Sequence, residues 1–441
     1  MNSTRITRIV AIVAIVAGCS STGTTAAPAS GATQPTAATS AAPASIVVTS
    51  GIPQMTVRFA VEPYADHTDA SIALAKGWFN DVGIDLHWQN IDADKISSVL
   101  VAGTVDVASA APALLIPSMK QAQFQNFVFG DLFQGYAIMA QAGAKRYSDF
   151  VSAGQSPADA IRSTMAQLKG KTFTYPAEAA IKPFIDLAFQ KGGLTLQDVQ
   201  SQVQPDANGV ALMLAKKADF EVGGVPSHVT LQSQGFVPIL SSIDLVKAAV
   251  ASPDSVELRA IAHNGWTTTK AYADANHDTL LRLASVKFRI MQFINDHPDE
   301  ACSIQMPFLN QQAGSGFASA ECKVIYNSLD PFYTFKAQSS WFNNKSDPLY
   351  WSYELDSVIN LYVQQGLFTA GEFKAADISQ ADQIYQQLDQ MRQQTEKNLP
   401  QLVNATGAAA QLRDMAKTYY DDFDYLDSSR LSQQALTASG A

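Results

Sequence analysis

The sequence is poor in the residues that build metal centres and reactive thiol sites. Its 441 residues include three cysteines and six histidines, with no HExxH pattern, no CxxC pair and no two histidines four residues apart. Zinc sites and metallopeptidase helices depend on such spacings. We therefore expect no metal centre, no cofactor and no enzymatic activity.

Basic residues are also scarce relative to acidic ones. The chain has 30 Lys+Arg against 40 Asp+Glu, a formal net charge of -10 and a pI of about 5.1. Nucleic-acid-binding domains show the opposite balance. After residue 17 no apolar run is long enough to cross a bilayer. The composition therefore argues against a nucleic-acid partner and against a membrane-embedded body.

The N-terminus carries the features of an export signal. Arg5 and Arg8 precede an apolar run over residues 9–16, which ends at Ala17-Gly18-Cys19. A short positive region, about ten apolar residues and small residues at the cleavage site are typical of a secretory signal. Residues 16–19 resemble a bacterial lipobox, in which the cysteine is lipidated. We expect a signal peptide over 1–18 and lipidation of Cys19.

The next segment, residues 19–50, has the composition of a tether. It is almost entirely Ala, Thr, Ser, Pro and Gly after Cys19, with no aromatic residue and no charge. Such a segment cannot bury enough apolar surface to offset the entropy lost on ordering. We therefore expect a disordered tether that leaves the protein lipid-anchored on the extracytoplasmic side of the cell membrane, in a periplasm or on the outer face of the cytoplasmic membrane.

The two remaining cysteines are Cys302 and Cys322. An even pair in an exported chain predicts a disulfide, worth about 3 kcal/mol in the chain-entropy model. Two buried free thiols are the alternative.

The body of the chain alternates short apolar strands with helical patterns, which predicts an α/β protein. We expect the first sheet to contain strands at 55–61, 84–88, 105–108, 127–129 and 136–140. The second sheet would contain 172–175, 199–203 and 237–240, and a strand at 256–262 would return to the first. Helical periodicity follows over 277–297, 347–365 and 379–397.

About 390 residues are too many for one core, so we expect two lobes. Lobe 1 would comprise 51–145 and 251–441, including extra C-terminal helices, and lobe 2 would comprise 146–250. Ligands bind outside the carboxyl ends of strands in open α/β sheets. The expected cleft loops are 62–68, 109–112, 131–136, 175–180 and 223–227.

Several segments resemble the substrate-binding proteins of nitrate, sulfonate, taurine and thiamine-precursor ABC importers. They are the helix and strand at 72–86, the approach to the third strand at 101–108, LKGK at 168–171, KGGL at 191–194, the helix junction at 293–301 and QQGL at 364–367. The resemblance implies a periplasmic-binding-protein type II fold. Such a clamp closes on a small molecule, is monomeric, and presents its ligand to an ABC permease and ATPase.

The loop 62–68 resembles the thiamine-precursor branch, which implies an aromatic nitrogen heterocycle as ligand. Tyrosines could stack on such a ring, and Glu62 and Asp66 could accept its N–H groups, although the branch often has an aromatic residue where Glu62 stands. The alternative is that Asp66 and Asp69 cap the following helix and His67 is solvated. The candidate ligand-binding residues are Glu62, Tyr64, Asp66, His67, Ser109, Ala110, Tyr136, Tyr175, Glu178, Gly223, Gly224 and His228.

Three other functions compete with this hypothesis. A sulfonate, taurine or nitrate carrier would want basic cleft residues, but the expected loops contain no Arg or Lys. A sensory or assembly lipoprotein could keep the fold without transport. An enzyme would need a nucleophile beside a base. Ser227 and His228 are adjacent in the sequence, but the side chains of adjacent residues rarely face each other. The tail at 400–441 would be a docking helix or extra packing on lobe 1.

Overall fold

The computed structural model describes residues 52–249 and 255–440. The expected signal peptide 1–18, the tether 19–50 and Cys19 lie outside the described residues. The described chain is built around two five-stranded sheets, called sheet A and sheet B below.

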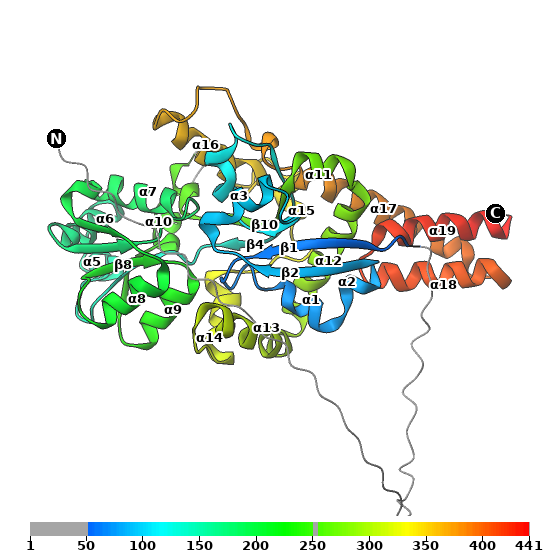
Figure 1. Cartoon of the computed structure of the whole chain (residues 1–441), viewed down its shortest axis with the longest axis horizontal. Coiled ribbons are helices and arrows are strands. Elements are labelled where there is room, and N and C mark those ends of the chain that lie inside the picture. The colour runs from blue at the N-terminus through cyan, green and yellow to red at the C-terminus, as the bar shows by residue number, and fades with distance from the viewer. Residues whose placement is uncertain (1–51, 250–254, 441) are drawn as a thin grey trace, which may run out of the picture. The chain divides into compact units, whose positions relative to one another are not determined.

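Sheet A has the strand order β2-β1-β3-β10-β4 (Figure 1). Its strands are β1 Met55–Val61, β2 Ile84–Asn90, β3 Val107–Ser109, β4 Phe124–Phe133 and β10 Ala262–Thr269. Strand β1 pairs in parallel with β2 and β3, whereas β10 runs antiparallel between β3 and β4. All residues of β4 are buried, including the polar Gln125, Asn126 and Asp131.

Sheet B has the order β7-β6-β8-β5-β9 and is formed by one continuous segment of the chain. Its strands are β5 Ala137–Ala140, β6 Thr172–Tyr175, β7 Gln200–Val203, β8 Phe220–Gly223 and β9 Val237–Ser241. The prediction that residues 136–140 complete the first sheet is wrong, because β5 pairs with β8 and β9. The chain thus crosses between β4 and β5, earlier than expected. The lobe limits stay a prediction.

The return to sheet A also differs from the predicted strand at 256–262. Residues Val256–Ala260 form the 3-10 helix η5, and β10 begins only at Ala262. The side chains of Ser255 and Glu257 are hydrogen-bonded, and the Leu258 amide donates to the Ser255 carbonyl at 3.2 Å. These local bonds close a turn, which overrides the alternating apolar pattern of Val256, Leu258 and Ala260.

Helices cover both sheets. Those of the sheet B segment are α5 Tyr147–Ser152, α6 Pro157–Met165, α7 Lys182–Gly192, α8 Asp206–Leu214, α9 Val225–Ser233 and α10 Ser242–Ala249. The others up to residue 364 are α1 Ala70–Lys76, α2 Trp78–Asp81, α3 Ile96–Val101, α4 Pro112–Leu115, α11 Lys270–Ala275, α12 His277–Asp296, α13 Pro298–Ala313, α14 Ser319–Val324, α15 Ser339–Asn343 and α16 Trp351–Gln364. The predicted helices at 277–297 and 347–365 are confirmed as α12 and α16. Within the described residues, no helix is both long and apolar enough to span a membrane.

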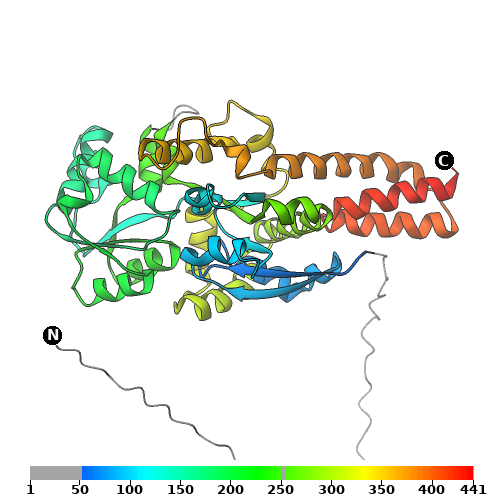
Figure 2. The same ribbon diagram turned by 45° about the horizontal axis from the view of Figure 1, so that its top comes forward.

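The C-terminal part forms a layer of three helices, α17 Ala381–Asn398, α18 Gly407–Asp421 and α19 Tyr425–Ser439. They lie side by side on the side of sheet A away from sheet B (Figure 2). Helix α17 confirms the predicted helix at 379–397. The buried Arg282 of α12 binds Asp427 of α19 through two hydrogen bonds of 2.8 and 3.0 Å. The tail therefore packs on the sheet A part of the chain.

Candidate ligand-binding site

Two adjoining cavities lie between the carboxyl ends of the parallel strands of sheet A and those of sheet B. The outer cavity has a volume of about 590 Å³ and the inner one about 10 Å³. Drug-sized and cofactor-sized ligands occupy pockets of roughly 300–1,000 Å³, whereas the inner volume suits about one water molecule. The outer cavity is therefore the one large enough for a small organic ligand.

Each of the five predicted cleft loops supplies a lining residue. Loop 62–68, called the ligand loop below, follows β1 and contributes Tyr64 to both cavities. From sheet B, Glu178 follows β6 and Asp206 begins α8, and both line the outer cavity. Prolines that restrict the backbone complete the outer wall at Pro63, Pro176, Pro205 and Pro226.

Tyr64 connects the two sides of the cleft. Its hydroxyl donates to Glu178 Oε2 at 3.1 Å. Its ring lies against the backbone of Gly224, where an added Cβ would approach the ring carbons to 3.1 Å. The Gly224 amide donates to Asp206 Oδ2 at 3.1 Å. A side chain at position 224 would therefore push the ligand loop away from sheet B.

Four carboxyl groups converge on this region. Burial and, to a lesser extent, the nearby charge of Asp206 together raise the pKa of Glu178 to about 8. Burial also raises the pKa of Asp66 to about 7 and that of Asp206 to about 6. The pKa of Glu62 lies well above its usual value, because Glu62 is buried and faces Glu178 and Asp66.

The carboxyl groups still have unused hydrogen-bonding capacity. Buried oxygens of Glu62, Asp66 and Asp206 have no hydrogen-bond partner. Among the described lining residues, Lys95 is the sole lysine or arginine, and it is exposed and paired with Asp92. Unpaired buried carboxyl oxygens are costly and favour a partner that brings N–H donors or positive charge.

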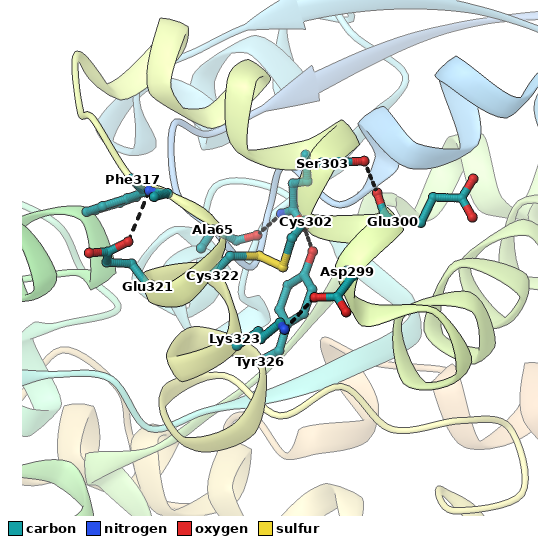
Figure 3. Close-up of a disulfide and its surroundings, with 12 residues drawn as sticks. Ala65, Asp299, Glu300, Cys302, Ser303, Phe317, Glu321, Cys322, Lys323 and Tyr326 are labelled. Atoms are coloured by element: carbon teal, nitrogen blue, oxygen red, sulfur yellow. Dashed lines mark hydrogen bonds and ion pairs between the residues drawn. A yellow bond between two sulfur atoms is a disulfide. The ribbon is translucent and has the colours of Figure 1, made fainter.

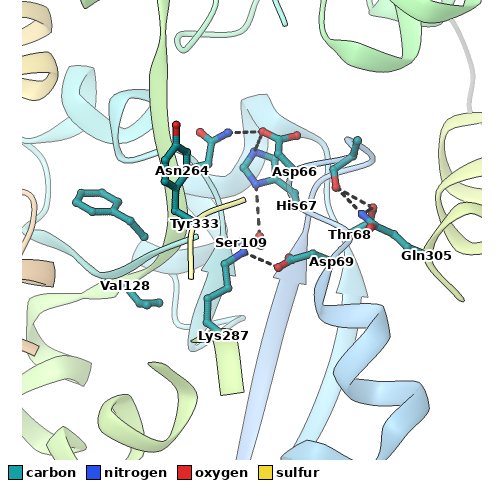
Figure 4. Close-up of polar contacts among 12 residues, drawn as sticks. Asp66, His67, Thr68, Asp69, Ser109, Val128, Asn264, Lys287, Gln305 and Tyr333 are labelled. Atoms are coloured by element: carbon teal, nitrogen blue, oxygen red, sulfur yellow. Dashed lines mark hydrogen bonds and ion pairs between the residues drawn. The ribbon is translucent and has the colours of Figure 1, made fainter. Parts of the chain in front are cut away.

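Side chains of sheet A hold the ligand loop in place (Figure 4). Asn264 of β10 donates to Asp66, and His67 Nε2 lies 3.4 Å from the same carboxyl group. On its other side, His67 Nδ1 lies 3.3 Å from Ser109 Oγ. Burial lowers the pKa of His67 to about 3, so its ring is neutral. The alternative of a solvated His67 is wrong, because its exposed fraction is 4%.

The expected capping roles of Asp66 and Asp69 are also wrong. Asp69 precedes α1 but makes no side-chain cap, and its carboxyl group instead accepts from Lys287 Nζ at 2.6 Å. Both side chains are fully buried. Lys287 reaches Asp69 past Gly130, where an added Cβ would lie 2.1 Å from Lys287 Cε. An ion pair with a residue 218 positions away outweighs the local cap.

Neither hydroxyl-imidazole pair has the geometry of a nucleophile and its base. In a serine hydrolase the serine meets histidine Nε2 and the aspartate meets Nδ1, whereas Ser109 and Asp66 meet the opposite nitrogens. Ser109 is also fully buried and lines neither cavity. His228 Nδ1 faces the Gly135 carbonyl at 3.0 Å. In the described chain, no group of three His, Cys, Asp or Glu residues is arranged to hold a metal.

The cavities bring together seven of the predicted site residues, namely Glu62, Tyr64, Asp66, His67, Tyr136, Glu178 and Gly224. Five others lie behind the cavity walls, namely Ser109, Ala110, Tyr175, Gly223 and His228. Ser109 supports His67, and Tyr175 stacks on Phe173 within β6. Whether any of them contacts a ligand stays a prediction.

Three residues near the site were missed, Asp206, Asn264 and Lys287. Asp206 follows Pro205, a signal for a helix start close to a strand end. Lys287 interrupts the apolar face of α12 between Leu283 and Met291, and a lysine at such a position needs a buried partner. Asn264 carries no sequence signal, because its strand was placed too early.

Comparison with known proteins fits this geometry. The NMT1/THI5-like family model matches residues 64–301, more than half of the chain. The chain belongs to the NMT1/THI5-like family. The family resemblance seen in the sequence is thereby confirmed. No curated protein matches the sequence.

Solved structures show the same fold. The periplasmic nitrate-binding protein NrtA from Synechocystis PCC 6803 superposes with a TM-score of 0.53 at 17% identity, covering 76% of this chain and 89% of that one. The periplasmic aliphatic sulphonate-binding protein SsuA from Escherichia coli gives 0.51 at 12% identity, covering 73% and 91%. The predicted fold class, two α/β lobes of the periplasmic-binding-protein type with added C-terminal helices, is confirmed.

Proposed function

We propose that this chain is the solute-binding subunit of an ABC importer and captures a small cationic or N–H-rich molecule in the outer cavity. An aromatic nitrogen heterocycle, such as a thiamine precursor, is the ligand class we favour. The observation that carries the proposal is the position of Glu178 and Asp206 in the wall of the outer cavity, with Glu62 and Asp66 in the adjoining inner cavity. The one described lysine in the lining is exposed and already paired.

The shape of the site supports a clamp mechanism. The Tyr64 hydroxyl joins the ligand loop to Glu178 across the cleft. A ligand that contacts both Tyr64 and Glu178 binds the closed arrangement better than an open one and shifts the population towards closure. Closure would then present the loaded form to a permease and ATPase. The known relatives in the fold include nitrate and sulphonate binders, but an anion would meet the carboxyl groups described here.

The ligand class is tested by isothermal titration calorimetry with five probes: benzamidine, thiamine, riboflavin, taurine and nitrate. We expect a cationic or heterocyclic probe to bind, and we expect neither the zwitterionic sulphonate taurine nor the anion nitrate to bind. At a pH above the pKa of about 8 of Glu178, where its carboxyl group is ionised, Glu178→Gln should weaken binding of the cation by roughly thirty-fold, the value of about 2 kcal/mol for a hydrogen bond to a charged group. Asp85→Asn, an exposed site with the same change of charge, should leave affinity unchanged. Binding of taurine or nitrate alone would contradict the proposed ligand class.

The lipid anchor is a separate part of the proposal and rests on residues 16–19. Fractionation of cells expressing Cys19→Ala should move the protein from the membrane to the soluble fraction. Cys19→Ala protein that remained in the membrane pellet would show that another part of the chain holds it there. We expect the purified protein to be a monomer.

A further inference from the structure

Helices α13 and α14 form a hairpin that is closed by a disulfide beside the ligand loop. Cys302 of α13 and Cys322 of α14 are joined, with their Cα atoms 5.9 Å apart (Figure 3). Both cysteines are buried. The predicted pairing is therefore confirmed.

One helical turn beyond each cysteine lies a buried polar residue. Gln305 follows Cys302 by three positions, and Tyr326, in the helical continuation of α14, follows Cys322 by four. Residues at these spacings share one face of a helix. The Tyr326 hydroxyl donates to Gln305 Oε1, so the disulfide and this hydrogen bond join the same two faces.

The free end of Gln305 is bound to the ligand loop. Gln305 Nε2 donates to the Ala65 carbonyl at 2.5 Å and to Thr68 Oγ1 at 3.0 Å. Inside the loop, the amides of His67 and Thr68 donate to the Tyr64 carbonyl at 3.2 and 3.1 Å. Gln305 thus holds the backbone immediately after Tyr64, the residue that reaches across the cleft.

Sheet A does not replace this support. Sheet A reaches the side chains of Asp66 and His67, and Lys287 of α12 reaches that of Asp69. Gln305 holds the backbone carbonyl of Ala65, on the opposite side of the loop from Lys287 (Figure 4). The amide of Gln305 is oriented in turn by Tyr326, because a hydroxyl donating to Oε1 fixes which end faces the loop.

We propose that Gln305 and Tyr326 are positioning residues for the ligand loop and that the Cys302–Cys322 disulfide holds the pair in register. This inference rests on the proposed function, since it assigns the loop to ligand capture. The pair touches neither cavity. It acts through the orientation of Tyr64 and the carboxyl groups of the loop.

The loop itself is the first readout and needs no ligand. Hydrogen exchange should be measured by mass spectrometry on peptides covering residues 62–69 in Tyr326→Phe, Gln305→Met and the double variant Cys302→Ser/Cys322→Ser. We expect exchange in this peptide to be about five-fold faster in the first two variants, the factor for one lost buried hydrogen bond, and faster still in the third. Peptides from α12 and β4 should keep the wild-type rates.

Lys323→Ala is the matched control. Lys323 of α14 forms an ion pair with Asp299 of α13 at 2.5 Å and so joins the same helices, but both side chains are largely exposed. We expect the wild-type exchange rate over residues 62–69 in this variant. An increase equal to that of Tyr326→Phe would overturn the special role of the Gln305–Tyr326 pair, as would uniform acceleration across the whole protein.

Binding gives the second readout, using whichever probe binds the wild-type protein. Tyr326→Phe and Gln305→Met should each weaken affinity about five-fold, and combining them should add little, because both remove one network. If no probe binds the wild-type protein, the proposed function fails while the exchange result still decides this inference. If wild type binds a probe and Tyr326→Phe binds it equally well with unchanged loop exchange, the positioning role is refuted.

Discussion

Buried carboxyl groups set the behaviour of the site at the scale of single residues. Burial raises the pKa of Asp206 to about 6, of Asp66 to about 7, and of Glu178 to about 8. These groups are ionised in the unfolded chain above about pH 4. Each therefore takes up a proton on folding at intermediate pH and favours a positive ligand once that proton leaves.

The ligand-free protein should lose stability as the pH rises from about 4 to 8. Because the folded pKa values of these carboxyl groups exceed those of the unfolded chain, the groups bind more protons in the folded state over this range. Their effect outweighs the opposite one of His67 and His228, whose pKa values burial lowers, so the free energy of unfolding falls with pH. We expect a decrease of at least about 3 kcal/mol, measured by urea denaturation at several pH values. A combined Glu178→Gln and Asp206→Asn variant should show a flatter profile, and an unchanged slope would contradict the assignment.

The Lys287–Asp69 pair gives a second prediction at this scale. Lys287→Met should lower the free energy of unfolding by about 4 kcal/mol, because it leaves the carboxyl group of Asp69 buried without its partner. Adding Asp69→Asn should recover part of that loss, measured by urea denaturation. If Asp69→Asn lowered the free energy of unfolding as much in the Lys287→Met protein as in the wild-type protein, the two side chains would not be coupled.

Sequence reasoning found the ligand loop but not the contacts that hold it. Glu62, Tyr64 and Asp66 could be placed at the cleft because they follow an evident apolar strand, and carboxyl ends of strands line such clefts. The partner of Asp69 lies 218 residues away, and no local pattern connects the two. The local alternative, a helix cap, was therefore the only role that the sequence suggested for Asp69.

At the scale of helices and strands, α19 depends on a buried ion pair. Arg282 of α12 and Asp427 of α19 form two hydrogen bonds and are less than a tenth exposed. The helix has little other charge pairing with α12, apart from the exposed Arg430–Asp278 contact. The pair therefore contributes strongly to the attachment of the C-terminal layer.

Asp427→Ala should destabilise the protein by about 3 kcal/mol, because the buried Arg282 then loses both of its hydrogen bonds to a carboxylate. Ligand affinity should not change, since neither residue lines a cavity. Thermal unfolding monitored by circular dichroism measures the loss of stability, and calorimetry measures the ligand affinity. Asp278→Ala, which removes the exposed pair, should cost less than about 1 kcal/mol, and an equal loss from both variants would contradict the role of burial.

The strand and helix pattern could be predicted well where periodicity was strong. Strand β1 and the long helices α12 and α17 stand close to their predicted limits. The sheet that receives β5 could not be predicted, because four buried apolar residues fit either sheet and pairing with β8 and β9 depends on distant residues. The predicted strand at 256–262 is wrong because alternating apolar residues suggested a strand, whereas the turn that Ser255 and Glu257 form could not be seen in that pattern.

At the scale of the whole molecule, the proposed function depends on how closely sheets A and B approach. The contact of Tyr64 with Gly224 and Glu178 joins the two sides in this structure, and we expect it to limit their approach. Gly224 has extended backbone angles that any residue adopts. A larger side chain there would therefore act through its bulk alone.

Gly224→Val should hold the lobes apart and weaken ligand affinity by about ten-fold or more. Small-angle X-ray scattering should give a larger radius of gyration for the variant, with a smaller decrease on adding the probe that binds wild type. Gly316→Val is the control, because a Cβ there meets open space. Equal affinity and scattering for Gly224→Val and wild type would exclude a closure role for this contact.

The position of β10 in sheet A has a consequence for the order of events during synthesis. Strand β4 has no partner in sheet A until β10 inserts between it and β3, and β10 is translated after every strand of sheet B. Sheet B can therefore assemble on the nascent or emerging chain, whereas sheet A stays incomplete until residues 262–269 are available. A chain halted before β10 would present a finished sheet B and an unpaired β4, whose Phe124, Phe127 and Phe129 side chains are buried only in the complete fold.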